Sequence, residues 1–220
     1  MRFPRPVRAV VFDMDGLLVD SESAWRDAMM QAAAARGREL PLPVFLSLIG
    51  GSRTRTADIL SRHFGEAFDL EAYLDEASVI AHALLDARDC LKAGAREILD
   101  AVEAKGLPRA LCTSSGMTAV ERHLGRSGLL PRFQALVTRE SVVNGKPHPE
   151  PYLKAAAALA VAPADCLALE DSHNGVRSAC SAGMMTVMAP DLLPATDEIR
   201  ALCLHIAADL HEVREMLAER

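Results

Sequence analysis

The sequence has no excess of basic residues, and this absence removes a class of partners. Its 24 lysines and arginines are outnumbered by 30 aspartates and glutamates, so the formal net charge is -6. Proteins that bind nucleic acid or an anionic membrane usually show the opposite balance. We therefore expect no nucleic acid and no membrane as a partner, and an anionic substrate would have to be held by local charge.

Long apolar runs and paired cysteine motifs are also absent. No stretch approaches the ~18 apolar residues that cross a bilayer, and the apolar part of residues 1–11 is too short for a signal peptide. We therefore expect a cytoplasmic protein. The five cysteines form no C-x-x-C pair, and we interpret all of them as buried free thiols. They are Cys90, Cys112, Cys166, Cys180 and Cys203.

Several catalytic motifs are missing as well. None of the seven histidines lies in an H-E-x-x-H zinc motif. Ser114 and Ser115 lack the G-x-S-x-G frame of many serine hydrolases, because Cys112 fills one of its glycine positions. A cysteine phosphatase loop would need an arginine six residues after Cys112, where this chain has Thr118.

What the chain does have is apolar material for a substantial core, since 50% of its residues are hydrophobic. Short apolar runs of strand length are separated, nearly all of them, by helical patterns. This alternation predicts an α/β fold with a doubly wound parallel sheet, covered by helices on both faces. The expected strands are residues 8–13, 108–113, 135–138, 166–170 and 185–189, with 205–209 as an edge strand.

Between residues 21 and 91 the pattern changes, because helical segments occur there without a convincing strand. This predicts a helical insert placed after the first strand. Its helices are expected at 22–36, 54–64 and 70–87, and those of the sheet region at 93–105, 118–124, 149–160, 172–182 and 210–218.

Acidic residues follow two of the predicted strands. Ligands of an open parallel sheet bind beyond the carboxyl ends of its strands. Asp13 and Asp15 follow the first strand, and Glu170 and Asp171 end the fourth. Adjacent buried acids repel each other unless a cation compensates, and an oxygen-rich set suits Mg²⁺. The alternative is that Asp171 or Ser172 only caps the next helix.

Two further segments could hold a phosphate. Lys146 lies in the loop Gly145-Lys-Pro-His-Pro149, where it could act as a point charge on a phosphate oxygen or simply be solvated. Thr113 and Ser114 end the second strand with hydroxyls and backbone amides, which either form an anion cradle or an ordinary turn.

In order along the chain, these segments resemble the four motifs of the haloacid dehalogenase superfamily. The matching residues are Val10-Val-Phe-Asp-Met-Asp-Gly-Leu-Leu-Val-Asp-Ser-Glu22 for motif one, Leu111-Cys-Thr-Ser-Ser115 for motif two, Gly145-Lys-Pro-His-Pro149 for motif three and Leu169-Glu-Asp-Ser-His-Asn-Gly175 for motif four. The insert looks like the α-helical cap of the β-phosphoglucomutase-like phosphatases. The resemblance covers the whole chain and implies a core of residues 1–20 and 93–220 with a cap of residues 21–92.

The resemblance also implies roles for these residues. Asp13 would attack phosphorus and form an aspartyl-phosphate, and Asp15 would protonate the leaving oxygen and then activate water. Thr113, Ser114 and Lys146 would hold phosphoryl oxygens. The implied Mg²⁺ ligands are Asp13, the backbone carbonyl of Asp15, Asp171, and Glu170 directly or through water.

Departures from the mutases of the family favour a phosphatase. β-Phosphoglucomutase has a cap histidine and a lysine-asparagine pair at positions that correspond here to Trp25, and to Gly116 with Met117. Arg53 matches a cap arginine that reaches the substrate in relatives, or is an exposed helix-start residue. Trp25 either faces the substrate or packs within the cap.

We expect a Mg²⁺-dependent hydrolase of a small phosphorylated metabolite such as a sugar phosphate. A phosphosugar mutase and a non-catalytic binding protein on the same fold are the alternatives. We expect a monomer, because the cap would need freedom to move.

Overall fold

The computed structural model describes residues 3–49, 53–87 and 90–218. The chain forms two compact units, one of residues 1–20 and 91–220 and one of residues 21–90. The first is named the sheet unit here and the second the helical unit. None of the described helices is long and apolar enough to span a membrane.

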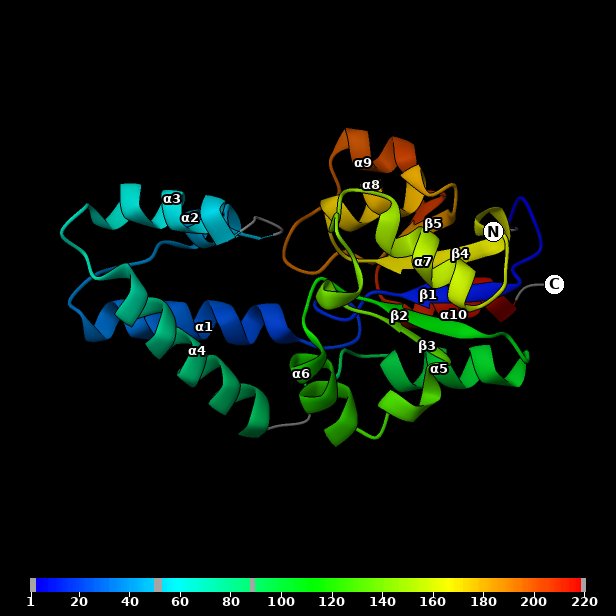
Figure 1. Cartoon of the computed structure of the whole chain (residues 1–220), viewed down its shortest axis with the longest axis horizontal. Helices are drawn as coiled ribbons and strands as arrows, with labels where there is room; N and C mark the ends of the chain where they lie inside the picture. Colours follow the sequence, from blue (N-terminus) through cyan, green and yellow to red (C-terminus); the bar gives the residue numbers. More distant parts are fainter. Residues whose placement is uncertain (1–2, 50–52, 88–89, 219–220) are drawn as a thin grey trace. The chain divides into compact units, whose positions relative to one another are not determined.

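A six-stranded parallel sheet forms the centre of the sheet unit (Figure 1). Its strand order is β3-β2-β1-β4-β5-β6, so the chain winds outward from β1 to both sides. This confirms the predicted doubly wound α/β fold. The strands are β1 (Ala9–Phe12), β2 (Arg109–Cys112), β3 (Ala135–Val137), β4 (Cys166–Glu170), β5 (Met185–Met188) and β6 (His205–Ile206).

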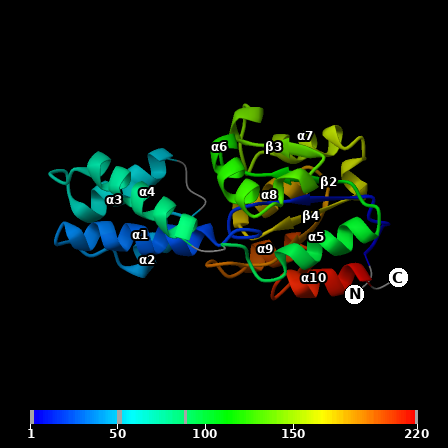
Figure 2. The same cartoon turned by 90° about the horizontal axis from the view of Figure 1, so that it is seen from below.

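The strands read as unbroken apolar runs because helices cover both faces of the sheet. Successive side chains alternate between the faces, and small residues such as Ala110 and Ala168 line one of them. On that face they pack against α7 (Glu150–Ala158) and α8 (His173–Ser181). Figures 1 and 2 show α5 (Ala95–Ala104) and α10 (Leu210–Ala218) on the opposite side.

The register brings the ends of three strands to one edge. Phe12 of β1 lies opposite Leu111 of β2 and Leu169 of β4. The next residue, Asp13, extends the ladder, since its N–H donates to the Leu169 carbonyl oxygen at 3.0 Å. The residues that follow β1, β2 and β4 therefore share the carboxyl edge of the sheet.

Two local elements of the sheet unit differ from expectation. The helix expected over 118–124 is a short α6 (Met117–Val120) followed by a π-helical turn, Glu121–Gly125. A helix that was not expected, α9 (Asp197–Leu202), begins at Thr196, whose hydroxyl accepts a hydrogen bond from the Ile199 N–H. Short 3₁₀ turns occupy Leu130–Arg132, Arg139–Ser141 and Pro163–Asp165.

Over its described residues, the helical unit holds the three expected helices and one more. They are α1 (Ser21–Ala35), α2 (Leu42–Leu46), α3 (Arg53–Phe64) and α4 (Leu70–Ala87). Helices α1 and α4 pack closely through buried alanines, and the Tyr73 hydroxyl donates to the Met29 carbonyl oxygen at 3.0 Å. The five-residue α2 starts at a proline-rich segment and is too short to give a periodic signal.

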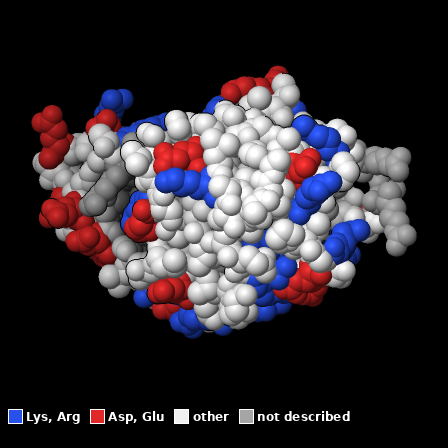
Figure 3. Space-filling view, turned by 45° about the vertical axis from the view of Figure 1, so that its right-hand side comes forward, with Lys and Arg blue, Asp and Glu red and all other residues white. Residues whose placement is uncertain are grey.

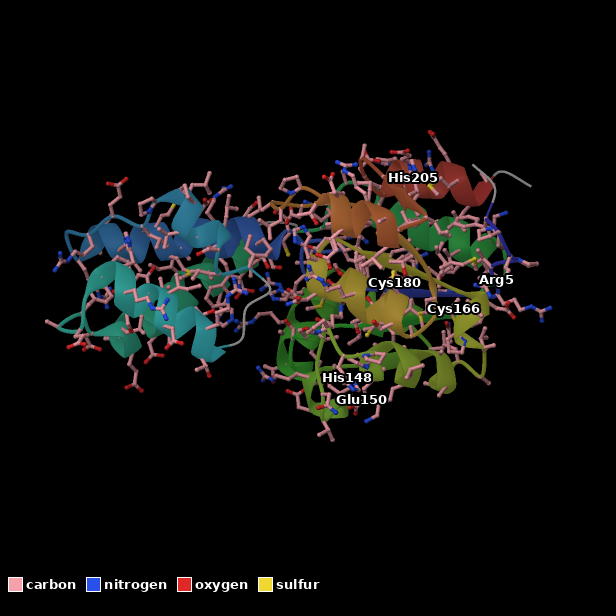
Figure 4. The ribbon with its side chains drawn as sticks, turned by 90° about the horizontal axis from the view of Figure 1, so that it is seen from above. Arg5, His148, Glu150, Cys166, Cys180 and His205 are labelled. Carbon is pink, nitrogen blue, oxygen red and sulfur yellow. The ribbon has the colours of Figure 1, made fainter. Side chains whose placement is uncertain are left out.

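The cysteines are all free, but the prediction that all are buried is wrong for two of them. Cys90, Cys112 and Cys166 are buried, whereas Cys180 and Cys203 are half-buried. Cys180 on α8 and Cys166 at the start of β4 are labelled in Figure 4.

Candidate active site

Three acidic side chains converge at the carboxyl edge of the sheet. Asp13, Glu170 and Asp171 each offer a carboxylate oxygen, and these oxygens all lie within 4.8 Å of one another. All three residues are buried. The first follows β1 and the other two end β4, which is the neighbouring strand. Sequence reasoning placed these acids at a common edge, and the structure brings them together.

Lys146 is the cation of this site. Its Nζ lies 2.6 Å from Asp13 Oδ1 and 2.5 Å from Glu170 Oε1, and its side chain is 6% exposed. Burial lowers the pKa of Lys146, but the two carboxylates more than offset this effect and raise it well above its ordinary value. The ammonium group also lies 5.2 Å from the centre of the Tyr152 ring. Lys146 is therefore a fixed positive charge and not a solvated loop residue.

Glu170 is held by an extensive set of donors. The Tyr152 hydroxyl donates to Oε1 at 2.6 Å, and the Ser172 hydroxyl donates to Oε2 at 3.1 Å. The backbone N–H groups of Asp171 and Ser172 also point to Oε2. Ser172 caps α8 as well, because its hydroxyl accepts from the Gly175 N–H. The capping alternative thus holds for Ser172, while Asp171 joins the acidic cluster.

The Asp15 carboxylate does not belong to the group of three acids whose oxygens lie within 4.8 Å of one another. Its Oδ2 accepts hydrogen bonds from Thr113 Oγ1 at 3.2 Å and from Ser115 Oγ at 2.7 Å. The Ser115 N–H in turn donates to Thr113 Oγ1. The hydroxyls at the end of β2 therefore fix the Asp15 carboxylate, and Ser114 between them is exposed.

The carboxyl groups of the site outnumber its one ammonium group, that of Lys146, so their negative charge is not fully compensated. Burial raises the pKa of Asp13 to about 8; Lys146 lowers it, while Glu170 and Asp15 raise it. Positive charge bound beside Asp13 would favour its ionised form. The three converging side chains offer carboxylate oxygens, which a hard divalent cation prefers. The residues therefore fit a bound divalent ion.

The turn after β1 depends on Gly16. Its φ of +80° lies in the left-handed region, and a Cβ atom there would come within 2.2 Å of Asp171 Oδ2. The Gly16 N–H donates to the Val19 carbonyl oxygen at 2.8 Å. Glycine thus serves both the backbone turn and the close approach of Asp171.

The two predicted substrate residues belong to the helical unit. The Trp25 side chain is half-buried, and its ring meets that of His82 edge to face at 6.1 Å between centroids. Arg53 begins α3, but its side chain lies outside the described residues. Both remain predictions as substrate contacts.

Other side chains of this region have local or unexpected partners. His148 Nδ1 accepts from the Glu150 N–H, and His173 Nε2 lies 3.0 Å from the Pro194 carbonyl oxygen. His148 and Glu150 lie next to each other at the start of α7 in Figure 4. Sequence reasoning missed the roles of Ser115 and Tyr152. The position of Ser115, two residues after Thr113 at the same strand end, could have indicated its role. Tyr152 lies in a helix, and nothing in the sequence around it indicates a contact with Glu170.

Comparison with known proteins gives a consistent result over most of the chain. The profile of the haloacid dehalogenase-like hydrolases matches residues 7–183. Hexitol phosphatase B of Escherichia coli (strain K12) is 31% identical over 202 residues, which cover 86% of each chain. The phosphorylated carbohydrates phosphatase of Thermotoga maritima is 31% identical over 183 residues, which cover 81% of this chain and 82% of that one.

Among solved structures, a HAD family hydrolase of Deinococcus radiodurans R1 with bound phosphate and sodium superposes with a TM-score of 0.80. It is 26% identical, and the superposition covers 97% of this chain and 96% of that chain.

Proposed function

This chain belongs to the haloacid dehalogenase-like hydrolases, and we propose that it releases phosphate from a small sugar-like phosphate ester through an aspartyl-phosphate on Asp13. It is a hydrolase of phosphoric monoesters, as its named relatives are. The observation that carries the proposal is the contact of buried Asp13 with Lys146, next to Glu170 and Asp171. That arrangement unites a nucleophile, a phosphate-binding cation and a cation site.

In the first step, the Asp13 carboxylate attacks phosphorus, and the bond from phosphorus to the ester oxygen breaks. Asp15 gives its proton to that leaving oxygen. In the second step, Asp15 takes a proton from water, the water oxygen attacks phosphorus, and phosphate leaves as Asp13 is restored. The hydrogen bonds from Thr113 and Ser115 support this role, because they hold the Asp15 carboxylate in one orientation.

Thr113, Ser114 and Lys146 are the proposed phosphate-binding residues. The exposed Ser114 offers its backbone and hydroxyl at the end of β2, and Lys146 supplies a full positive charge. On the face drawn in Figure 3, the described lysines and arginines are interspersed with acids and uncharged residues and form no continuous basic surface. Recognition of an anion therefore depends on these local groups.

Mg²⁺ is the proposed cofactor, with Asp13, the carbonyl of Asp15, Glu170 and Asp171 as the residues that would hold it. When bound, such an ion would neutralise the acids and a phosphoryl oxygen, so that two like-charged groups can approach each other. The Asp15 carboxylate itself is engaged by hydroxyls, which supports a contribution from its backbone instead.

The helical unit is proposed to act as a cap domain that carries substrate contacts, with Trp25 and Arg53 as candidates. Its insertion soon after β1 and the acids Asp13 and Asp15 that follow this strand supports this role. A sugar-like substrate is supported by the relatives, which are named for hexitols and phosphorylated carbohydrates.

A mutase is not favoured. A bisphosphate intermediate needs a second anion site, and the positions of the mutase lysine and asparagine are Gly116 and Met117 here. The Glu140 carboxylate borders them, since its Oε2 accepts from the Met117 N–H, and a negative charge there would repel a second phosphate. A mutase would move phosphate within a sugar phosphate, whereas we expect release of phosphate to water.

The test is phosphate release from an aryl phosphate by the purified chain. We expect turnover with Mg²⁺ and none after EDTA treatment. Acid quenching during turnover should trap a phosphoprotein that hydroxylamine cleaves, as expected of an acyl phosphate. Asp13→Asn should lose turnover and the trapped species while remaining folded. Normal turnover by Asp13→Asn would refute the nucleophile, and Mg²⁺ binding without turnover on a broad phosphate panel would favour a binding protein.

A further inference from the structure

A fourth acid lies beside the three of the active site. Asp191 follows β5, and its side chain is 7% exposed. Its Oδ1 accepts from Lys92 Nζ at 2.6 Å. Its Oδ2 is buried and receives no hydrogen bond from any described residue. Buried polar atoms in native proteins nearly always have a partner, because leaving one without a donor costs free energy.

The free oxygen of Asp191 points toward the acidic cluster. A Cβ atom on Gly16 would lie 2.2 Å from Asp171 Oδ2 and 3.3 Å from Asp191 Oδ2, so the two oxygens border the same small space. Within the described residues, however, Asp191 is not among the acids whose oxygens lie close enough to share an ion directly. Its distance suits an interaction through water.

Lys92 compensates the negative charge of Asp191, which lies next to three other acids. Its backbone N–H donates to the Leu18 carbonyl oxygen at 2.9 Å, and the preceding Leu91 pairs with Val19. The lysine is thus anchored to the segment that follows Gly16. Because its ammonium group pairs with Asp191, that acid adds little net charge to the site. The ion pair fixes Oδ1 and leaves Oδ2 directed at the cluster.

We propose that Asp191 is a positioning residue of the metal centre, whose Oδ2 accepts a hydrogen bond from a water molecule on the ion held by Asp171. This inference rests on the proposed function, because it assumes a divalent ion at that site. Mg²⁺ keeps several of its waters when bound to protein. Groups that orient ligands from outside the coordination sphere typically contribute roughly 10–100-fold in metal affinity.

The test is calorimetric titration of Mg²⁺ into the EDTA-treated full chain. Asp191→Asn keeps the shape of the side chain but removes the charge and one acceptor oxygen, and it should weaken Mg²⁺ binding by about 10-fold or more. Asp191→Ala should weaken it at least as much. Asp100→Asn removes the same charge from an exposed position, 68% exposed, and should bind Mg²⁺ as the wild type does. Urea unfolding in EDTA establishes that each variant is folded.

Lys92→Met distinguishes the effect of the acceptor oxygen Oδ2 of Asp191 from the effect of its ion pair with Lys92. It removes the pair but keeps Oδ2, so its Mg²⁺ affinity should fall less than that of Asp191→Asn. Equal losses in both variants would assign the effect to the ion pair and overturn the proposal. So would a wild-type Mg²⁺ affinity in Asp191→Asn, with the proposed function left intact. A wild-type chain that hydrolyses phosphate esters without binding Mg²⁺ would overturn both metal assignments.

Discussion

The carboxylate of Glu170 lies where a side-chain carbon on residue 175 would have to be. A Cβ atom on Gly175 would come within 1.8 to 2.0 Å of both carboxylate oxygens and Cδ of Glu170. Gly175 is not among the residues with positive φ, so the backbone itself does not require glycine there. The buried acid requires it, and a larger residue would push Glu170 away from Lys146.

Gly175→Ala should therefore lower the activity of the enzyme more than the stability of its fold. We expect kcat/KM to fall about 100-fold, since a shift of about 1 Å in a catalytic group can cost that much. The free energy of unfolding should fall by about 1–3 kcal/mol, as for other overpacked sites. Gly125→Ala is the matched control, because a Cβ there meets no atom within 4 Å. Equal activity of the two variants would contradict this role of Gly175.

The sheet was predictable because its strands are apolar on both faces, and several of these apolar runs end at acidic or hydroxyl residues. The strand ends supplied Asp13, Glu170 and Asp171 by the rule that ligands bind at the carboxyl edge. That rule needs only the order and direction of the strands, which the alternation with helices provides. The register that sets Asp13 beside Glu170 then follows from Phe12 opposite Leu169.

Residues that act through side-chain packing were not predictable in this way. Tyr152 reaches Glu170 from helix α7, and nothing in a helical sequence marks which hydroxyl will meet a buried acid. Asp191 also follows a strand, β5, so the carboxyl-edge rule covers it, but its relation to Asp171 depends on the turn at Gly16. The end of the helix at Val120 depends on a π-helical turn that residue propensities do not encode.

Asp171→Asn should make the metal-free protein more stable and the enzyme inactive. The substitution removes one of three crowded carboxylates, so we expect a higher melting temperature in EDTA than for the wild type. Mg²⁺ at 100 times its Kd should stabilise the wild type by about 2.7 kcal/mol and the variant by much less. Calorimetric melting with and without Mg²⁺ measures both effects. A wild-type response to Mg²⁺ in the variant would remove Asp171 from the ligand set.

Ser115→Ala should impair proton transfer to the leaving group. The hydroxyl donates to Asp15 Oδ2 at 2.7 Å, and its loss leaves this carboxylate less firmly held, although Thr113 still donates to it at 3.2 Å. General acid catalysis contributes about 10²–10⁴-fold in total, so we expect kcat for an alkyl phosphate to fall by roughly 10-fold or more. An aryl phosphate, whose leaving group needs less protonation, should be affected less. Ser181→Ala, an exposed serine on α8, is the control; equal losses on both substrates would argue against this role.

Glu150→Gln should destabilise the protein in a pH-dependent way. A hydrogen bond from Lys154, together with the backbone N–H groups of Val143 and Asn144, lowers the pKa of Glu150 from 4.5 to about 2. A lowered pKa in the folded state stabilises it above about pH 4.5, and this contribution is lost as the pH falls through about 2. Urea unfolding at pH 7 should show the wild type as the more stable protein, with the difference shrinking at pH 3. Glu215→Gln, exposed on α10, is the charge-matched control; a difference that does not depend on pH would contradict the assignment.

Tyr152→Phe tests whether the buried hydroxyl serves Glu170. It removes one donor to a charged acceptor, a hydrogen bond of 2.6 Å, so we expect the free energy of unfolding to fall by about 1.5–3 kcal/mol. Activity should fall as well, because Glu170 then depends on Lys146 and Ser172 for its position. Tyr73→Phe is the matched control, since that buried hydroxyl donates to a neutral carbonyl in the helical unit. It should cost about 1 kcal/mol and leave kcat unchanged. If both variants keep full activity, Tyr152 stabilises the sheet unit without positioning the acid.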